Sequence, residues 1–229
     1  LRGMPFINVP TTLLAMVDAS IGGKVAIDME EGKNLIGAFH HPKFVLSDVR
    51  TLNTLPQREL ISGWAEVLKH SLILDKQLLV TLEDQVEAIL NLQEDITTKV
   101  IRRSVAIKAD IVSQDEREIF DIRTLLNYGH TIGHALETAS NYKAYLHGEA
   151  VSIGMIGAGH IGKEMGLISA TDLLRQHNAL EAFGLPVAYE GNSIDVETIR
   201  NAMKMDKKKI GHTIRWVLLE NIGQAVIRN

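Results

Sequence analysis

The chain has 229 residues, of which 45% are hydrophobic and 23% are charged, and its formal net charge is −4. This balance is typical of a globular protein with a buried core and gives no global case for nucleic acid or an anionic membrane as a partner. Because cysteine is absent, disulfides and thiolate metal sites are excluded, and any metal has to be held by histidines and carboxylates. No apolar run approaches the roughly 20 residues of a membrane span. We expect a cytoplasmic protein of one large domain or a domain and a half.

Residues 1–54 read as the β-rich part of the chain. Short apolar runs such as "PFINVP" and "KFVLSD" are bounded by proline, aspartate and glycine, as is typical of strands. We expect "KVAIDMEEGKN" to form a strand, a glycine turn and a loop. Lys24, Lys33 and Asn34 flank this glycine-containing region, which suits the binding of a phosphate or carboxylate. Solvated loop lysines are the alternative.

From residue 55 onward the pattern is helical. Apolar residues recur at helical spacing in "PQRELISGWAEVLKHSLIL" and over residues 76–113, 130–140 and 147–167. Two further helices are expected at "SATDLLRQHNALEAFG" and "IDVETIRNAMKMDKKK", and two strand-like runs around an Asn-Ile-Gly turn close the chain. The sequence therefore predicts a β-containing segment followed by a mainly helical domain.

One glycine pattern needs a separate interpretation. "GAGHIG", residues 157–162, matches the dinucleotide fingerprint G-x-G-x-x-G, which requires a preceding strand and a following helix. Here small residues recur every three or four positions through "HGEAVSIGMIGAGHIGKEMGL". We therefore predict close helix packing at these glycines.

Histidines are concentrated in one region. His130 and His134 are four residues apart and share a helix face, and His147 follows in "LHGEA". Imidazole is a good ligand for zinc and related ions, so a metal site is one interpretation. A core histidine with two surface histidines is the other. Glu66 and Lys69 also share a helix face at i, i+3, where a surface ion pair is the simpler reading.

Basic residues gather in "MKMDKKK", at Lys204, Lys207, Lys208 and Lys209. An anion site and a solvated basic face both fit this stretch. Nucleic acid is disfavoured because no aromatic residues are interleaved and the net charge is negative. Arg123 and Asn127 are more suggestive, since they precede His130 by about two turns and one turn.

The chain resembles the 3-dehydroquinate synthase family in six stretches that follow the same order: "VPTTLLAMVDASIGGKVAID", "GKNLIGAFHHP", "TLNTLPQRELISGWAEVLKH", "DERE…RTLLNYGHTIGHALE", "LHGEAVSIGM" and "MDKKK". The resemblance implies an α/β remnant of a nucleotide-binding domain at residues 1–54, followed by a mainly α-helical metal- and substrate-binding domain at residues 55–229. It also implies that the chain corresponds to the C-terminal two-thirds of the family's protein, without the glycine-rich loop that binds NAD pyrophosphate.

The resemblance also assigns roles to single residues. The ligands of a zinc or cobalt ion would be Glu66, His130 and His147, and His134 would be a proton-handling neighbour that faces the substrate. Cofactor-binding positions would be Thr11, Thr12, Asp18, Lys24, Lys33, Thr51, Leu52, Asn53 and Thr54. Substrate-binding positions would be Arg2, Lys24, Asn34, Lys69, Lys108, Arg123, Asn127, Lys207 and Lys208. Lys69, Arg123 and Asn127 would join His134 as catalytic residues.

The reaction that the resemblance implies converts 3-deoxy-arabino-heptulosonate 7-phosphate to 3-dehydroquinate and phosphate in the shikimate pathway. The C5 hydroxyl would be oxidised transiently with NAD, phosphate would leave by elimination, and an aldol step would close the ring. We expect a homodimer that binds a small sugar phosphate and neither nucleic acid nor membrane. Two alternatives stay open: a related sugar-phosphate cyclase with another product, and an inactive fragment that needs the missing N-terminal region.

Overall fold

The computed structural model describes residues 3–29, 32–190, 194–207 and 214–229. Arg2 and Lys208 lie outside the described residues, and so do the side chains of Lys33, Asn34 and Lys207. Within the described ranges, no helix is long and apolar enough to cross a membrane.

Residues 3–54 form short strands and two irregular helical segments. β1 (Ile7–Asn8) pairs in parallel with β4 (Phe44–Val45), and β2 (Lys24–Met29) pairs antiparallel with β3 (Gly32–Phe39). The π-helix η1 (Ala15–Ala19) precedes β2, and the 3-10 helix η2 (Val49–Thr54) ends the segment. The prediction of a loop after the glycine turn is wrong, because this stretch pairs with β2 and thereby satisfies its backbone groups.

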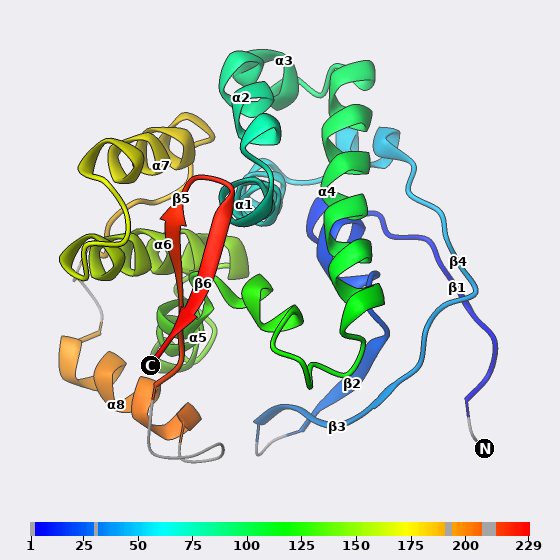
Figure 1. The fold of residues 1–229 in the computed structure, drawn as a ribbon. Coiled ribbons are helices and arrows are strands. Elements are labelled where there is room, and N and C mark those ends of the chain that lie inside the picture. Colours follow the sequence, from blue (N-terminus) through cyan, green and yellow to red (C-terminus); the bar gives the residue numbers. More distant parts are fainter. Residues whose placement is uncertain (1–2, 30–31, 191–193, 208–213) are drawn as a thin grey trace.

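Helix α1 (Gln57–Leu74) lies at the centre of the helical part, as Figure 1 shows. α2 (Lys76–Asp84) and α3 (Val86–Leu90) lie above α1 in Figure 1, and α4 (Glu94–Gln114) lies to its right. η3 (Arg123–Asn127), α5 (His130–Ala139), α6 (His147–Glu164), α7 (Ala170–Ala182) and α8 (Val196–Lys207) come next in the chain. The closing hairpin of β5 (Trp216–Asn221) and β6 (Gln224–Arg228) packs on α6 and α1. The predicted fold class is thus confirmed.

The central helix α1 is buried along most of its length. Trp64, Leu68 and Leu72 have no exposed surface, and the Trp64 ring lies 5.7 Å from that of Phe183. Each such side chain contributes about 1.5–3 kcal/mol on burial. Glu66, Lys69 and His70 are equally buried in the same helix. Charged side chains are rarely fully buried unless they are paired, and buried charged groups cluster at functional sites. Helix α1 is therefore a candidate location of the functional site.

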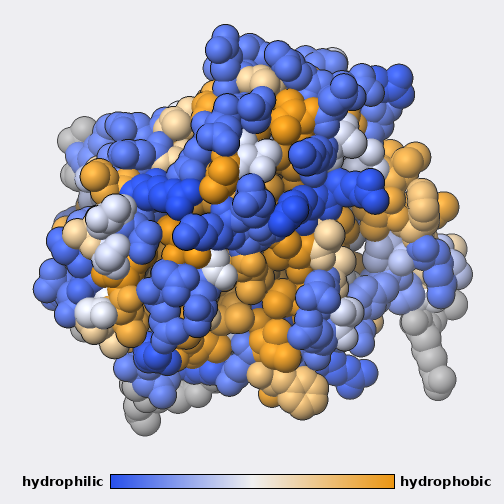
Figure 2. Space-filling view, turned by 45° about the horizontal axis from the view of Figure 1, so that its top comes forward, coloured by the Kyte–Doolittle hydropathy of each residue, from blue (hydrophilic) through white to orange (hydrophobic). Residues whose placement is uncertain are grey.

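Apolar side chains also reach the surface in the N-terminal segment. Ile7, Val9 and Phe44 are exposed by 62%, 58% and 56%. Figure 2 shows apolar residues at the surface among hydrophilic ones on one face of the molecule. Parallel strands normally belong to a larger sheet whose two faces are covered. The two-stranded β1–β4 pair therefore resembles part of such a sheet.

Glycines allow α1, α5 and α6 to approach one another closely. A Cβ atom at Gly148 would lie 1.8 Å from the carbonyl oxygen of Ser62, and one at Gly154 would lie 1.9 Å from that of Gly129. The "GAGHIG" stretch is inside α6, where a Cβ atom at Gly159 would lie 2.6 Å from Leu173 Cδ1. The helix-packing prediction is therefore confirmed.

Replacing Gly148 with alanine is expected to destabilise the fold by about 1–3 kcal/mol or more, because the obstructing atom is backbone and the two helices have to separate. Gly162→Ala is the matched control in the same helix, since its nearest neighbour is the Ile168 side chain at 3.3 Å. Thermal unfolding followed by circular dichroism compares the two variants. Equal stability of both would show that the contact at Gly148 is unimportant.

Candidate metal and substrate site

Three helices bring one acid and two histidines together. Glu66 comes from the middle of α1, His130 begins α5, and His147 begins α6. The Glu66 Oε1 atom lies 3.7 Å from His130 Nε2 and 3.5 Å from His147 Nε2. The three ligand atoms all lie within 4.8 Å of one another. The structure thus brings together the residues that the family resemblance assigned to the metal.

Both histidine rings are oriented by contacts at their other nitrogen. His130 Nδ1 lies 3.1 Å from the carbonyl oxygen of Tyr128, and His147 Nδ1 lies 3.4 Å from Glu137 Oε1. If each Nδ1 donates its proton to that oxygen, each Nε2 lone pair faces Glu66. Metal-binding histidines in proteins are held in this way. Gly129, with φ of 79°, makes the turn that places His130 at the helix start.

The charge states of Glu66 and His130 suit metal ligation, whereas His147 holds a proton that a metal has to displace. Burial alone would raise the pKa of the Glu66 carboxyl, but the Lys69 ammonium and the neighbouring His147 hold it well below its usual value. Burial and the charge on Lys69 keep the pKa of His130 well below its usual value, so this ring is neutral. Burial would lower the pKa of His147, but Glu137 and Glu66 outweigh it and raise the pKa to about 10. The two carboxylates therefore favour a positive charge at His147. A metal cation and a proton compete for its Nε2 atom.

A divalent ion fits this group of residues. Both Glu66 carboxylate oxygens are fully buried. Oε2 is paired with the Lys69 ammonium, whereas Oε1 faces the two imidazoles at 3.7 and 3.5 Å and, among the described residues, accepts no hydrogen bond. Two imidazoles and one carboxylate are a common ligand set of catalytic zinc, which keeps a further coordination position open. The unsatisfied Oε1 atom is explained if a cation binds between the three side chains.

Lys69 is the fixed partner of Glu66. Its Nζ atom lies 2.5 Å from Glu66 Oε2, and the two residues are exposed by only 1% and 0%. The interpretation of this pair as a surface ion pair is therefore wrong. A buried pair of this kind is costly to break from one side, because the remaining charge has no solvent.

His134 lies beside the three candidate ligands. Its ring is 5.1 Å from that of His130 in an edge-on arrangement and 6.3 Å from that of His147. The residue is exposed, unlike Glu66. It does not share the close grouping of Glu66, His130 and His147. An exposed imidazole at this place is suited to exchanging protons.

Lys108 of α4 and Asp18 of η1 are bound to each other. Lys108 Nζ donates to the Asp18 carboxylate at 2.5 Å and to its backbone oxygen at 2.7 Å. Burial tends to raise the pKa of Asp18, but the Lys108 charge prevails and lowers it. A predicted cofactor residue and a predicted substrate residue are thus joined by one partly buried ion pair beside α1.

The loop at residues 115–122 connects further predicted substrate residues. Arg123 is buried and donates from Nη1 to the carbonyl oxygens of Gly22 and Glu116, at 3.0 and 2.7 Å. The Glu118 carboxylate contacts Lys24 and accepts from Asn127 Nδ2 at 3.2 Å. The structure therefore places Lys24, Arg123 and Asn127 around one loop and the β2–β3 hairpin.

The structure gives roles to two further acids, Asp115 and Glu137, to which the sequence pattern assigned none. Asp115 is buried and accepts from the backbone N–H groups of Ile119 and Arg123, at 2.8 and 3.2 Å, so it shapes the loop. Glu137 contacts His147 from the last turn of α5. A Glu three residues after His134 on the same helix face was the only available signal for Glu137.

Four of the nine predicted cofactor residues line a separate cavity. Thr11, Thr12, Thr51 and Thr54 line a cavity of about 650 Å³, together with Asp48, Arg50 and Leu55. Leu52 is buried in the core, whereas Asn53 is exposed. Threonine hydroxyls at such a place can bind the polar groups of a nucleotide.

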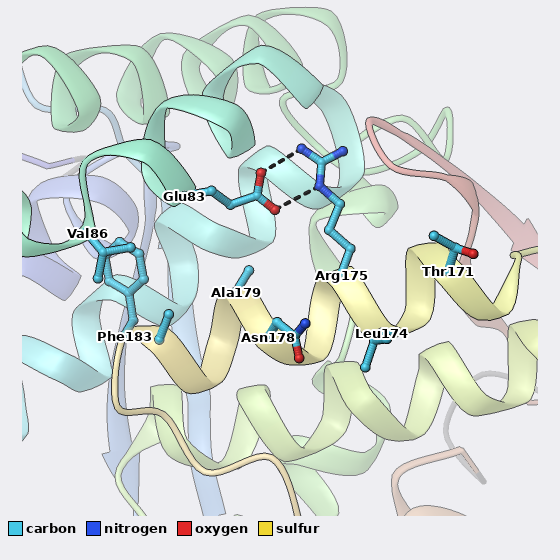
Figure 3. A pocket seen from close by; sticks show the side chains of 9 residues that line it. Glu83, Val86, Thr171, Leu174, Arg175, Asn178, Ala179 and Phe183 are labelled. Atoms are coloured by element: carbon cyan, nitrogen blue, oxygen red, sulfur yellow. Dashed lines mark hydrogen bonds and ion pairs between the residues drawn. The ribbon is translucent and has the colours of Figure 1, made fainter.

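Another cavity lies away from these residues. It has about 490 Å³ and lies between α7 and the α2–α3 region, as Figure 3 shows. Glu83 and Arg175, which form an ion pair at 2.6 Å, both line this cavity. None of the predicted site residues lines this cavity.

His70 predicts how acid affects the stability of the fold. Its Nδ1 atom lies 2.7 Å from Ser104 Oγ, and burial together with the Lys69 charge lowers its pKa to about 3. An unfolded histidine has a pKa of about 6.5, so between these values the unfolded chain binds the additional proton. Stability should therefore fall as the pH falls, by about 2–3 kcal/mol from pH 6.5 to 4.5.

Urea unfolding at several pH values tests this expectation. His70→Asn should flatten the dependence between pH 6.5 and 4.5, whereas His160→Asn, at an exposed position of α6, should leave it unchanged. Parallel curves for wild type and His70→Asn would contradict the assignment.

Solved structures with the same fold define the class of protein. The chain matches ValA, the 2-epi-5-epi-valiolone synthase of Streptomyces hygroscopicus subsp. jinggangensis 5008 with NAD+ and Zn2+ bound, with a TM-score of 0.89 and 30% identity over 100% of this chain and 63% of that one. It also matches a 2-deoxy-scyllo-inosose synthase complexed with carbaglucose-6-phosphate, NAD+ and Co2+, with a TM-score of 0.87 and 31% identity over the same shares. The fold is that of the sugar-phosphate cyclases.

The sequence comparisons specify the family. The family model for the 3-dehydroquinate synthase C-terminal region matches residues 63–209, and that for the N-terminal region matches residues 1–62. The 3-dehydroquinate synthase of Thermoanaerobacter pseudethanolicus is 44% identical over 227 residues, which are 99% of this chain and 63% of that protein. The chain belongs to the 3-dehydroquinate synthase family, and it spans less than two-thirds of the length of this relative.

Proposed function

We propose that this chain forms the metal- and substrate-binding part of a 3-dehydroquinate synthase, which converts 3-deoxy-arabino-heptulosonate 7-phosphate to 3-dehydroquinate and phosphate. The observation that carries the proposal is the convergence of Glu66, His130 and His147 from three helices. Identity of 44% to a relative of that name supports this reaction over those of the two structural neighbours, at 30% and 31%.

Glu66, His130 and His147 would hold the zinc or cobalt ion, and NAD would bind near the threonine-lined cavity. When bound, the ion would supply Lewis acidity toward a substrate oxygen, and NAD would supply reversible hydride transfer. Both groups are named in the structures of the two neighbours, which supports their use here. Lys69 would keep Glu66 ionised and in place through their 2.5 Å contact.

The cationic and amide groups around the loop would hold the anions of the substrate. Lys24 and Asn127 already bind a carboxylate, that of Glu118, so their arrangement suits a carboxylate or phosphate group. Arg123 would hold the loop against the β2–β3 hairpin, and His134 would exchange a proton with a substrate hydroxyl. The remaining predicted substrate-binding residues stay predictions: Arg2, Asn34, Lys108, Lys207 and Lys208.

The domain division also belongs to the proposal. Residues 1–54 would complete an NAD-binding domain with further chain of the family's protein, and residues 55–229 would form the helical domain. The small parallel β1–β4 pair, with its exposed Ile7 and Phe44, supports the first part. A homodimer in the cytoplasm stays a prediction.

The test uses the full-length protein that contains this chain. Supplied with the heptulosonate phosphate, NAD+ and Zn2+ or Co2+, it is expected to release phosphate and form 3-dehydroquinate without accumulating NADH. Phosphate assay and NMR of the product measure this. Folded, metal-loaded protein that releases no phosphate would refute the proposal.

A related cyclase with another product is the second candidate, because both structural neighbours are by name synthases of other products, a valiolone and an inosose. A panel with glucose 6-phosphate, whose carba-analogue is bound in one neighbour, and the heptulosonate phosphate separates the candidates. Preference for a substrate without a carboxylate would favour the second one.

A further inference from the structure

The imidazole of His147 is held between two carboxylates. Its Nε2 atom lies 3.5 Å from Glu66 Oε1, and its Nδ1 atom lies 3.4 Å from Glu137 Oε1. One side of the ring therefore faces the candidate metal position, and the other faces Glu137. His130 differs, because its Nδ1 atom faces the backbone carbonyl of Tyr128 and not a carboxylate.

Glu137 is itself held firmly in place. It is 7% exposed in the last turn of α5. Its carbonyl oxygen accepts from Tyr142 N at 2.8 Å and from Ser140 Oγ at 2.9 Å, which fixes the turn that follows the helix. A nearly buried carboxylate is costly unless it is paired, so its position against His147 calls for a reason.

We propose that Glu137 is a positioning residue for the metal ligand His147, whose Nδ1–H it accepts so that Nε2 is directed at the ion. The inference rests on the proposed function, because it presupposes that an ion binds at Glu66, His130 and His147. A carboxylate on the outer nitrogen of a histidine fixes the ring and its tautomer and makes it a better donor to metal. Removal of such a partner typically lowers metal affinity by about 10- to 100-fold.

The same atoms offer one competing explanation. His134, Glu137 and His147 also present ligand atoms within 4.8 Å of one another, so Glu137 could instead bind a second cation. The two explanations differ in stoichiometry. A positioning residue gives one ion per chain, and a second site gives two.

The experiment titrates Co2+ into the full-length wild type, Glu137→Gln and Glu137→Ala, with visible absorption and chelator competition as readouts. Gln keeps an acceptor oxygen of similar shape, and it should lose less affinity than Ala, whose loss should reach about 10- to 100-fold. The cobalt absorption bands should shift in Glu137→Ala because His147 is released. Glu164→Gln, at an exposed position near the end of α6, is the matched control and should bind cobalt like the wild type.

Each result has a separate meaning. Wild type that binds no cobalt refutes the proposed metal site itself. Wild type that binds one ion, with unchanged affinity and spectrum in both Glu137 variants, overturns the positioning role alone. Two ions in wild type and one in Glu137→Gln also overturn it, in favour of a second cation site. Circular dichroism verifies folding, and the Gln variant carries the test if the Ala variant unfolds.

Discussion

Replacing His130 with alanine is expected to abolish tight zinc or cobalt binding, whereas His134→Ala is expected to keep the metal and lose turnover. His130 Nε2 is directed at Glu66 by the contact of its Nδ1 atom with the Tyr128 carbonyl, so the substitution removes one of three ligands. The loss should exceed the roughly 10- to 100-fold effect of removing an outer partner. His134 lies outside the close group of ligand atoms and is exposed beside it.

Metal content after gel filtration and phosphate release by the full-length protein measure the two effects. Each histidine is the control for the other, because both lie on α5 one turn apart. Loss of metal in His134→Ala with retention in His130→Ala would reverse the assignment of the two residues.

Glu66→Gln is expected to lower the free energy of unfolding by about 3–5 kcal/mol, because it leaves the Lys69 ammonium buried without an ionic partner. Lys69 is 1% exposed and lies 2.5 Å from the Glu66 carboxylate. The double variant Glu66→Gln with Lys69→Met removes both charges and should recover much of this loss.

Urea denaturation in the presence of a chelator measures this effect without a contribution from metal binding. Lys69→Met alone completes the double-mutant cycle. A single Glu66→Gln variant as stable as the wild type would show that the buried pair does not carry the predicted energy.

Spacing in the sequence predicted the metal site only in outline. The i, i+4 spacing of His130 and His134 favoured the interpretation that both residues bind one ion. The structure instead groups His130 with His147 and with Glu66 from another helix. That grouping depends on the close approach of α6 to α1 at Gly148, a tertiary contact that no local pattern encodes. The family resemblance named the three residues that the structure groups together, because it compares whole sites.

Helices were predicted well because their apolar periodicity is long and regular, as in α1 and α6. Strand β3 and the π-helix η1 were missed because short glycine-containing or apolar segments carry little periodicity. The roles of Glu118 and Glu137 were missed because an isolated acid in a sequence looks like a solvated one. Only the contacts with Lys24, Asn127 and His147 reveal them.

The central claim is that Glu66, His130 and His147 hold one divalent ion, and anomalous diffraction from cobalt-loaded crystals of the full-length protein tests it most directly. The account predicts one strong cobalt peak per chain, within coordination distance of about 2.0–2.2 Å from Glu66 and both histidine Nε2 atoms. A peak between His134 and Glu137 with none at Glu66, or no peak at any of these residues, would contradict it.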